Sequence, residues 1–238
     1  MGLASFRALD ENIDFLPPPG TCAAYTPTVT LNDLVSPGLG LQRGRGLDAG
    51  APLLIHGPLG VKELEKGVRD PSIYWSLLGG NPPSIRGKPL FLEPGEYEMS
   101  APGGVDAGPF TAKALTPQPF EWSNRAAADS VDRRAGVSLV WKQTSPDDRA
   151  LILAANVDAA SGAMGLAVCS APRGSTRFTI PPAMLANLPA TPRETTGVLP
   201  LSLLAVAAVH ASPPIHPSGV EKAGVFFVSA SSRTVVYY

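Results

Sequence analysis

The stretch that decides the fold runs from residue 137 to residue 169 and reads VSLVWKQTSPDDRALILAANVDAASGAMGLAVC. Its first apolar segment places Val137, Leu139 and Trp141 at alternate positions, the period of a strand that buries one face. Two turn signals, rich in Asp, Ser, Pro and Gly, separate this segment from two further apolar segments. The pattern predicts a three-stranded antiparallel meander, which needs no crossover helix. The predicted strands are residues 137–142, 150–157 and 164–169.

Outward from this meander, most of the chain has the same extended pattern. Residues 95–101 are the clearest case, because Tyr97 and Met99 share one face of a strand while Glu96 and Glu98 share the other. Many short apolar runs with turn signals between them are typical of a β-sandwich. Further strands are predicted at residues 21–30, 53–56, 73–77, 89–92, 110–115, 176–180, 197–211, 225–230 and 233–238.

The composition agrees with this assignment and excludes several classes of protein. Of 238 residues, 26 are Pro and 24 are Gly, about one in five against roughly 12% in average proteins, which excludes a mostly helical fold. Helix is predicted at residues 181–188, with the N-terminal segment 3–12 as a second candidate. Hydrophobic residues make up 44% of the chain, and the net charge is −1. A buried core is therefore expected, and nucleic acid is not an expected partner.

The predicted fold class is all-β, an antiparallel β-sandwich of immunoglobulin- or fibronectin-like architecture in two sandwich-like halves with one short helix. The halves are residues 1–116, which include an extended N-terminal arm, and residues 117–238. The longest apolar-rich run, residues 198–209, is too short to cross a bilayer as a helix and contains Pro200. No membrane span is therefore predicted.

The two cysteines, Cys22 and Cys169, both lie in short strand-like segments rich in Ala, Ser and Thr. No Cys-x-x-Cys motif and no neighbouring histidine accompanies them, so a metal site would lack ligands. We predict a disulfide between them, which indicates an oxidising compartment and a secreted, extracellular or periplasmic protein. The alternative is two free buried thiols, which a cytosolic protein would tolerate equally well. The first residues lack the features of a secretory signal, so any signal has been removed or never existed.

Residues that could carry catalysis are few. The histidines His56, His210 and His216 follow no Gly-x-Ser-x-Gly elbow, and surface positions are the ordinary expectation for them. Glu96 and Glu98 are near enough for paired carboxylate chemistry, although a solvated strand face explains them better. The other candidate carboxylates are Glu63, Glu65, Glu93, Glu121, Asp129 and Asp132. No catalytic residue, metal site or cofactor is predicted.

A short sequence occurs twice, as Leu47-Asp-Ala-Gly50 and as Val105-Asp-Ala-Gly108. Such sequences are common in turns, because Asp can bond to its own backbone and Gly can adopt a positive φ. Recurrent turn chemistry is the simpler interpretation, and an internal duplication is the alternative.

Three aromatic residues are candidates for ligand binding: Tyr74, Trp75 and Trp122. They lie near turn signals, where an exposed ring can stack on the apolar face of a sugar. Packing within a core or between domains is the other interpretation. Trp141 alternates in phase with apolar neighbours and is expected in the core.

Five phrases of the sequence carry a resemblance to a known family. They are PGTC at 19–22, LDAG at 47–50, LFLEPGEY at 90–97, GGVDAGPF at 103–110 and FTIPPAML at 178–185. The chain resembles an uncharacterised family of secreted, Pro/Gly-rich β proteins that is abundant in genomes of acidobacteria, which are soil bacteria. The likeness runs from about residue 19 to Tyr238, and Cys22 and Cys169 lie where the family carries its cysteines. It implies export, and it brings no activity and no catalytic residues.

These observations favour a non-enzymatic extracellular interaction or structural protein whose partner is an unknown protein or polysaccharide. The alternative is a carbohydrate-binding module or a glycan-active enzyme that uses Trp75 or Trp122 as a stacking platform. Self-association is a further expectation, because residues 233–238 read as a strand without Pro or Lys, and such an edge invites pairing with another chain. If this strand is internal to its sheet, that expectation loses its basis.

Overall fold

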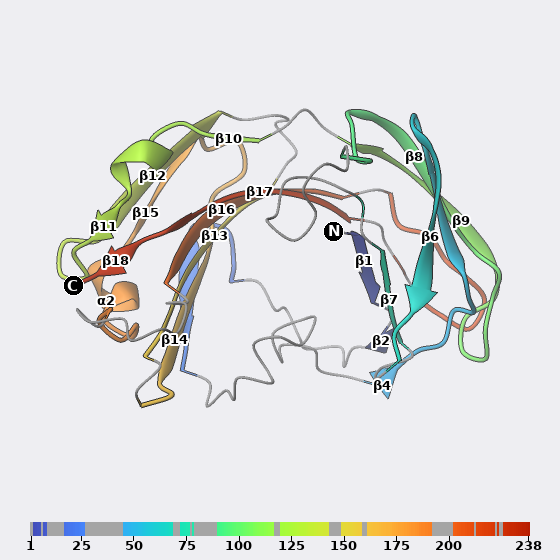
Figure 1. Cartoon of the computed structure of the whole chain (residues 1–238), viewed down its shortest axis with the longest axis horizontal. Coiled ribbons are helices and arrows are strands. Elements are labelled where there is room, and N and C mark those ends of the chain that lie inside the picture. Colours follow the sequence, from blue (N-terminus) through green and yellow to red (C-terminus); the bar gives the residue numbers. More distant parts are fainter. Residues whose placement is uncertain are drawn as a thin grey trace. The chain divides into compact units, whose positions relative to one another are not determined.

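The protein has an all-β fold, with antiparallel sheets in a sandwich-like arrangement, in the computed structural model of the chain (Figure 1). The structure describes residues 2–5, 7–8, 17–26, 45–68, 72–76, 78, 90–116, 120–142, 149–158, 161–191, 202–211, 213–221, 223 and 226–238. The α-helix of these ranges is α2 (Pro182–Leu185), which lies within the segment predicted as helix. None of the helices in the described ranges is long and apolar enough to cross a membrane. The many strands and the short α-helix of the described residues confirm the predicted all-β fold class.

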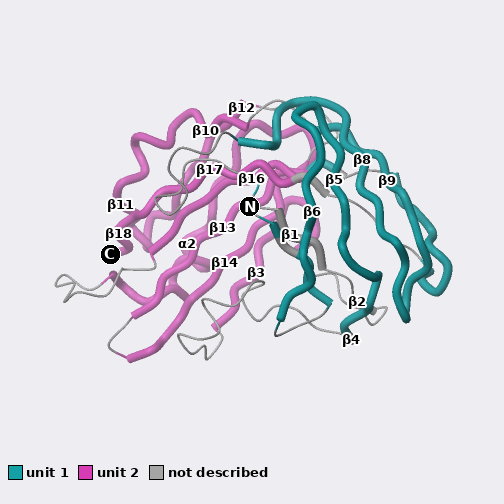
Figure 2. Tube along the Cα trace, turned by 45° about the vertical axis from the view of Figure 1, so that its right-hand side comes forward, with its two compact units in different colours: residues 1–13, 43–118, 210–227 teal, residues 14–42, 119–209, 228–238 magenta. Residues whose placement is uncertain are grey.

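The chain divides into two compact units, each built from three segments (Figure 2). Unit 1 comprises Met1–Ile13, Arg43–Gln118 and His210–Phe227. Unit 2 comprises Asp14–Gln42, Pro119–Val209 and Val228–Tyr238. Each unit therefore joins parts of the chain that are far apart in sequence. The division into domains 1–116 and 117–238 stays a prediction.

Unit 1 is built on one six-stranded antiparallel sheet. In sheet order the strands are β1 (Gly2–Ser5), β7 (Ile73–Ser76), β6 (Gly60–Lys66), β5 (Leu53–Gly57), β8 (Gly95–Ala101) and β9 (Phe110–Thr116). Strand β8 matches the predicted strand, with Tyr97 buried as its alternation required. The core of the unit gathers Leu53, Leu64 and Tyr97 from the sheet and Phe91 from a loop.

The helix considered for residues 3–12 is wrong where the structure describes that segment. Strand β1 pairs antiparallel with β7, with Gly2 opposite Ser76. The next two described residues form β2 (Arg7–Ala8), which pairs with β4 (Arg45–Gly46). A short isolated helix is marginal in water, whereas pairing with the edge of a sheet satisfies one side of the backbone at once. Residues 9–12 lie outside the described part of the chain.

Unit 2 contains a two-sheet sandwich. The larger sheet has the order β17 (Phe226–Thr234), β16 (Leu203–Ala211), β13 (Arg149–Val157), β14 (Met164–Ser170) and β3 (Thr21–Tyr25). The smaller has the order β10 (Glu121–Trp122), β12 (Val137–Lys142) and β15 (Arg177–Ile180). Leu139 and Trp141 of the smaller sheet and Ile152 and Leu204 of the larger are buried in one shared core. The core prediction for Trp141 is confirmed.

The predicted three-stranded meander is half correct. Strands β13 and β14 form the expected antiparallel hairpin, with Leu151 opposite Ser170. Strand β12 instead pairs with β10 and β15 in the other sheet. Alternation identifies which face of a strand is buried, and both sheets of a sandwich bury a face in the same core. The sequence pattern therefore could not decide in which sheet β12 lies. The predicted turn at 145–148 lies outside the described residues.

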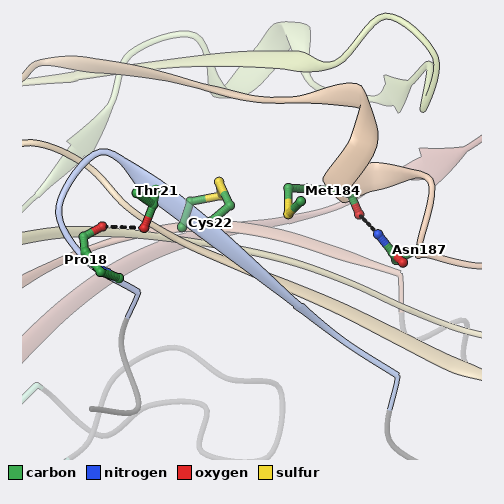
Figure 3. The surroundings of a disulfide bond; sticks show 6 residues. Pro18, Thr21, Cys22, Met184 and Asn187 are labelled. Atoms are coloured by element: carbon green, nitrogen blue, oxygen red, sulfur yellow. Dashed lines mark hydrogen bonds between the residues drawn. A yellow bond between two sulfur atoms is a disulfide. The ribbon is translucent and has the colours of Figure 1, made fainter.

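The predicted disulfide is present and joins neighbouring strands of the larger sheet. Cys22 of β3 lies directly opposite Cys169 of β14, with 4.0 Å between their Cα atoms. Cys169 is fully buried in the sandwich core and Cys22 packs against it. Met184 of α2 lies beside the disulfide (Figure 3). The bridge thus fixes an N-terminal strand as the last strand of a sheet made otherwise from the second half of the chain.

A buried polar junction anchors the last strand of the chain. Asn156, fully buried, accepts a hydrogen bond from Ser202 Oγ and donates from Nδ2 to Pro189 O at 2.8 Å. Thr191 Oγ1 lies 3.0 Å from Ser202 Oγ and accepts from Tyr237 N at 2.9 Å. Burial of these groups is tolerated because each has a partner.

The C-terminal segment is bonded on both sides. Strand β18 (Val236–Tyr237) pairs in parallel with β11 (Ser130–Val131). Val236 N donates to Asp129 O at 3.0 Å on that side, whereas Val235 N donates to Ser202 O at 3.3 Å on the other. The segment 233–238 is thus not a simple exposed edge, and self-association through it stays a prediction.

We predict that loss of the disulfide destabilises unit 2. The two cysteines are 147 residues apart, so reduction frees a long loop in the unfolded chain, and the expected cost is about 2–5 kcal/mol. The Cys22→Ala/Cys169→Ala variant should unfold roughly 5–15 °C below the oxidised wild type. Calorimetry of the variant, of the reduced wild type and of the oxidised wild type measures this. Two alkylatable thiols in oxidatively expressed protein, or equal melting temperatures, would contradict the prediction.

Candidate functional site

Two of the three aromatic residues predicted to bind a ligand, Tyr74 and Trp122, are buried. Tyr74 belongs to unit 1 and Trp122 to unit 2, and their side chains are 0% and 4% exposed. Trp122 Nε1 donates to Asn124 Oδ1 at 2.8 Å, and its ring is part of the sandwich core. The backbone of Trp75 pairs with Glu65 in β6, and its side chain lies outside the described part of the structure. Sugar stacking by Trp75 therefore stays a prediction.

The carboxylates considered for catalysis on β8 form a solvated ion-pair network. Lys113 Nζ of β9 lies 3.2 Å from Glu96 Oε1 and 3.9 Å from Glu98 Oε2. All three side chains are substantially exposed. Exposed pairs of this kind contribute little to stability, because solvent and salt screen them. Their arrangement is that of an ordinary polar strand face.

The histidines are dispersed. His56 is exposed on β5, His210 lies in β16, and His216 Nδ1 is 2.6 Å from the backbone oxygen of Glu221. Among the described residues, no three His, Cys, Asp or Glu side chains are grouped so that they could hold a metal ion.

A polar cluster of unit 1 is centred on Asp48, in the loop before β5. Asp48 Oδ1 accepts hydrogen bonds from Lys66 Nζ at 2.7 Å, from Gly50 N at 2.8 Å and from Tyr74 OH at 3.2 Å. Tyr74 OH in turn accepts from Ala49 N at 3.0 Å. The Asp48 and Lys66 side chains are each about 30% exposed. We call Asp48, Lys66 and Tyr74 the Asp48 cluster.

The electrostatics of this cluster keep every member in its usual protonation state at neutral pH. The hydrogen bond from Lys66, followed by that from Gly50, lowers the pKa of Asp48. The bond to Asp48 raises the pKa of Lys66, and burial raises that of Tyr74. A general acid or base works best with a pKa near the operating pH, and these shifts lead away from it. The cluster joins the loop that contains Asp48 to strands β6 and β7.

The Asp48 loop interlocks with the second copy of its own sequence. Asp48-Ala-Gly50 precedes β5, and Asp106-Ala-Gly108 precedes β9, the two strands that flank β8. Asp48 N donates to Asp106 Oδ2 at 2.8 Å, while Asp106 N and Ala107 N donate to Asp48 O at 3.1 Å. Since β5 and β9 are both antiparallel to β8, both loops enter the sheet at the same end. The repeated sequence marks two turns that support each other.

Glycine is required where the two loops meet. A Cβ on Gly104 would lie 2.4 Å from Gly50 N and 2.6 Å from Asp48 O. Gly50 has φ +80°, and a Cβ there would lie 2.1 Å from Gly103 O. Both contacts are with backbone atoms, which cannot move aside cheaply. The loops can therefore approach this closely only without side chains.

Unit 2 contains an open hollow of about 390 Å³ beside α2. It is lined by Arg133, Arg134, Pro182, Ala183, Ala186 and Tyr238, which we call the arginine groove. In Figure 1, α2 and the C-terminus lie close together at the same end of unit 2. The sequence analysis did not predict this site, because its residues come from a turn, a helix and Tyr238, which are far apart in sequence. The adjacent arginines inside a turn were the one available signal.

The turn that carries the two arginines is fixed by hydrogen bonds. Asp132 Oδ1 accepts from Arg134 N at 2.8 Å, and Asp132 O accepts from Gly136 N at 3.2 Å. Gly136 has φ +80°, and a Cβ there would lie 2.7 Å from Ile180 O. Arg133 Nη1 donates to Leu188 O at 2.6 Å. The turn is thus held against the segment that contains α2.

Comparison with known proteins places no constraint on these sites. No protein-family model, no curated protein and no solved structure matches the chain.

We predict that Asp48→Asn destabilises unit 1 by about 1–2 kcal/mol at pH 7, because Lys66 loses its charged acceptor. The pKa of Asp48 is lower in the folded chain, so its contribution exists above the unfolded pKa of about 3.9 and disappears as the pH falls through the folded pKa. The pKa of Lys66 is raised, so its contribution disappears as the pH rises through the folded value, above about 10.4.

Urea unfolding at pH 7 and at pH 3 tests this. The matched control is Lys113→Gln, which breaks an exposed ion pair and should change the free energy of unfolding by at most a few tenths of a kcal/mol at either pH. A wild-type advantage over Asp48→Asn that is equal at both pH values would argue against the assigned role of the carboxylate.

We also predict that Gly104→Ala costs about 2–3 kcal/mol, because its methyl group overlaps the backbone of the Asp48 loop. The control is Gly162→Ala, at a φ of +71° with no heavy atom within 4 Å of the new Cβ, which should cost only about 1 kcal/mol of backbone strain. Thermal unfolding of both variants gives the comparison. Equal losses would mean that the loops separate without cost.

Proposed function

We propose that the protein is a non-enzymatic binding protein that works outside the cytoplasm. The observation that carries the proposal is the arginine groove, where two guanidinium groups and an aromatic ring line one open hollow. Tyr238 is 61% exposed, and Arg134 is also exposed. Ligand sites are concave, largely apolar, and carry a few polar groups that set specificity.

The cross-strand disulfide supports the proposed compartment. A bond between Cys22 and Cys169 persists in an oxidising environment and is rare in the cytosol. It completes the larger sheet of unit 2, a structural position rather than that of an exposed catalytic pair. The resemblance to secreted bacterial proteins supports the same proposal.

We propose a protein without catalytic activity because of how two clusters of polar side chains are bonded. The Asp48 cluster is a closed set of hydrogen bonds, with its pKa shifts directed away from neutrality. The carboxylates of β8 share Lys113 in solvent. Neither cluster supplies a nucleophile with an adjacent base, which covalent catalysis requires.

We favour a carbohydrate as the ligand, although the aromatic residue that would contact it differs from those that the sequence indicated. Tyr74 and Trp122 were candidates for stacking, but their rings are buried. Tyr238 is the aromatic side chain that lines the hollow. A sugar would therefore contact Tyr238, with the arginines beside it.

We expect saturable binding of the purified protein to at least one glycan of an array that contains neutral and acidic polysaccharides. Incubation with each bound glycan should release no reducing ends above the rate of a blank. Release of reducing ends would identify an enzyme and contradict the proposal. The absence of binding to every glycan, together with no binding to extracellular matrix or cell-envelope proteins in biolayer interferometry, would contradict it as well.

A further inference from the structure

We propose that the disulfide between Cys22 and Cys169 is a redox switch. Its reduction by a dithiol releases strand β3 and opens the edge of β14 to the β3 strand of a second copy of the chain. Three observations carry this inference: β3 is held weakly apart from the disulfide, β14 needs a cover on its second edge, and one of the two cysteines is partly exposed. The switch does not depend on which ligand the protein binds.

Strand β3 buries little apolar surface. Its two end residues are exposed, and its central residues are only partly buried: Cys22, Ala23 and Ala24. Alanine side chains remove little apolar surface from water, and the burial of such surface is the main favourable contribution to folding. Keeping the backbone of a strand in one conformation also costs conformational entropy. The disulfide is therefore the strongest attachment of β3 to the rest of unit 2.

The hydrogen bonds around β3 can be replaced by bonds to water. The strand pairs with β14 along one edge, as the last strand of the larger sheet. Ahead of it, Gly20 N donates to Ser170 O at 2.7 Å, and Arg149 Nη2 donates to Pro17 O at 2.8 Å. Each such bond contributes only modestly to stability, because the unfolded segment bonds to water instead. These bonds keep β3 in place only while the disulfide prevents its separation from β14.

Strand β14, unlike β3, is buried on both faces. Ala167 and Cys169 belong to the sandwich core, whereas Met164 and Leu166 alternate with them and belong to a second buried cluster. The strand contains no charged residue and no proline. A strand of this composition pairs with other chains when one of its edges is free. Because β13 occupies one edge of β14, β3 is the strand that covers the other.

Reduction of the bond follows ordinary thiol–disulfide exchange. Cys22 is partly exposed whereas Cys169 is fully buried, so the first thiolate of the dithiol attacks Cys22 Sγ. The S–S bond breaks, and Cys169 leaves as a thiolate that takes up a proton. The second thiol of the reductant then displaces Cys22 Sγ from the mixed disulfide. The protein gains two electrons and two protons, and the dithiol leaves as its own disulfide.

The occupant of the open edge is the β3 strand of a second copy. Within one chain β3 pairs with β14 in a single register, with Cys22 opposite Cys169 and Tyr25 opposite Leu166. The same strand from another copy makes the same backbone pairs, so an exchange of strands between two copies loses none of them. The closed disulfide prevents this exchange, because β3 cannot leave the β14 strand of its own chain. Oxidation after the exchange joins Cys22 of one copy to Cys169 of the other.

Hydrogen–deuterium exchange of the full chain, with and without dithiothreitol, tests the release of β3. We expect exchange at the amides of residues 22–25 to rise by about tenfold or more on reduction, while β12, β15 and unit 1 keep their protection. The control is the Cys22→Ala/Cys169→Ala variant, in which dithiothreitol should leave the exchange unchanged. Unchanged exchange at residues 22–25 of the wild type would overturn the proposal. A loss of protection throughout unit 2 would overturn it as well, because the disulfide would then hold the whole unit rather than one strand.

A mixture of Cys22→Ala and Cys169→Ala chains tests the exchange of strands. Each variant keeps one cysteine, so a disulfide between Cys22 and Cys169 can form only between two copies. After the mixture is oxidised, we expect a covalent dimer on a non-reducing gel, and mass spectrometry of its peptides should identify the Cys22–Cys169 link. The oxidised wild type, treated in the same way, should remain monomeric.

Each variant oxidised alone is the matched control for random oxidation of thiols. Its covalent dimer should be much less abundant than the dimer of the mixture. Equal amounts of dimer in the mixture and in the single variants would overturn the proposed exchange, as would a mixture that forms no dimer. Circular dichroism and melting temperatures establish that each variant is folded before oxidation.

Discussion

The pairing of β3 with β14, fixed covalently by Cys22 and Cys169, is the constraint on which unit 2 depends. It brings a strand from the start of the chain to the end of the larger sheet. Helix α2 then packs on β3, with Met184 beside the disulfide, while its outer residues line the arginine groove. The strand that the disulfide fixes in the larger sheet therefore also contacts the helix that forms one wall of the groove.

In each unit, hydrogen bonds between polar groups join separate segments of the chain. Apolar packing alone would define the relative position of these segments less precisely. In unit 2, buried Asn156 connects Ser202 and the segment near Thr191. In unit 1, Asp48 connects its own loop to Lys66 and Tyr74. A buried polar group without a partner costs about 1–3 kcal/mol, so an alternative arrangement must recover every bond that it breaks. Hydrophobic cores give these units their stability, and the polar junctions select one arrangement of the chain.

The sequence predicted the features that depend on the alternation of apolar and polar residues along a strand, and the bond between the only two cysteines of the chain. The strand at 95–101, the core position of Trp141 and the Cys22–Cys169 bond are examples. It could not predict pairing between distant segments, so β12 was assigned to the wrong sheet and residues 3–5 and 7–8 were considered as helix. The arginine groove was missed for the same reason. Its residues come from three separated segments whose meeting depends on tertiary structure alone.

The contact between the two Asp-Ala-Gly loops also bears on how the sequence can change over time. A Cβ on Gly50 would overlap the backbone at Gly103, and a Cβ on Gly104 would overlap the backbone at Gly50 and Asp48, so a side chain at either position would displace the backbone of the other loop. A side chain at Gly50 or Gly104 therefore requires the partner loop to shift, although the two loops are 58 residues apart in sequence. We therefore expect the two loops to change in a correlated way among homologous proteins. An insertion in only one of the loops should be rare.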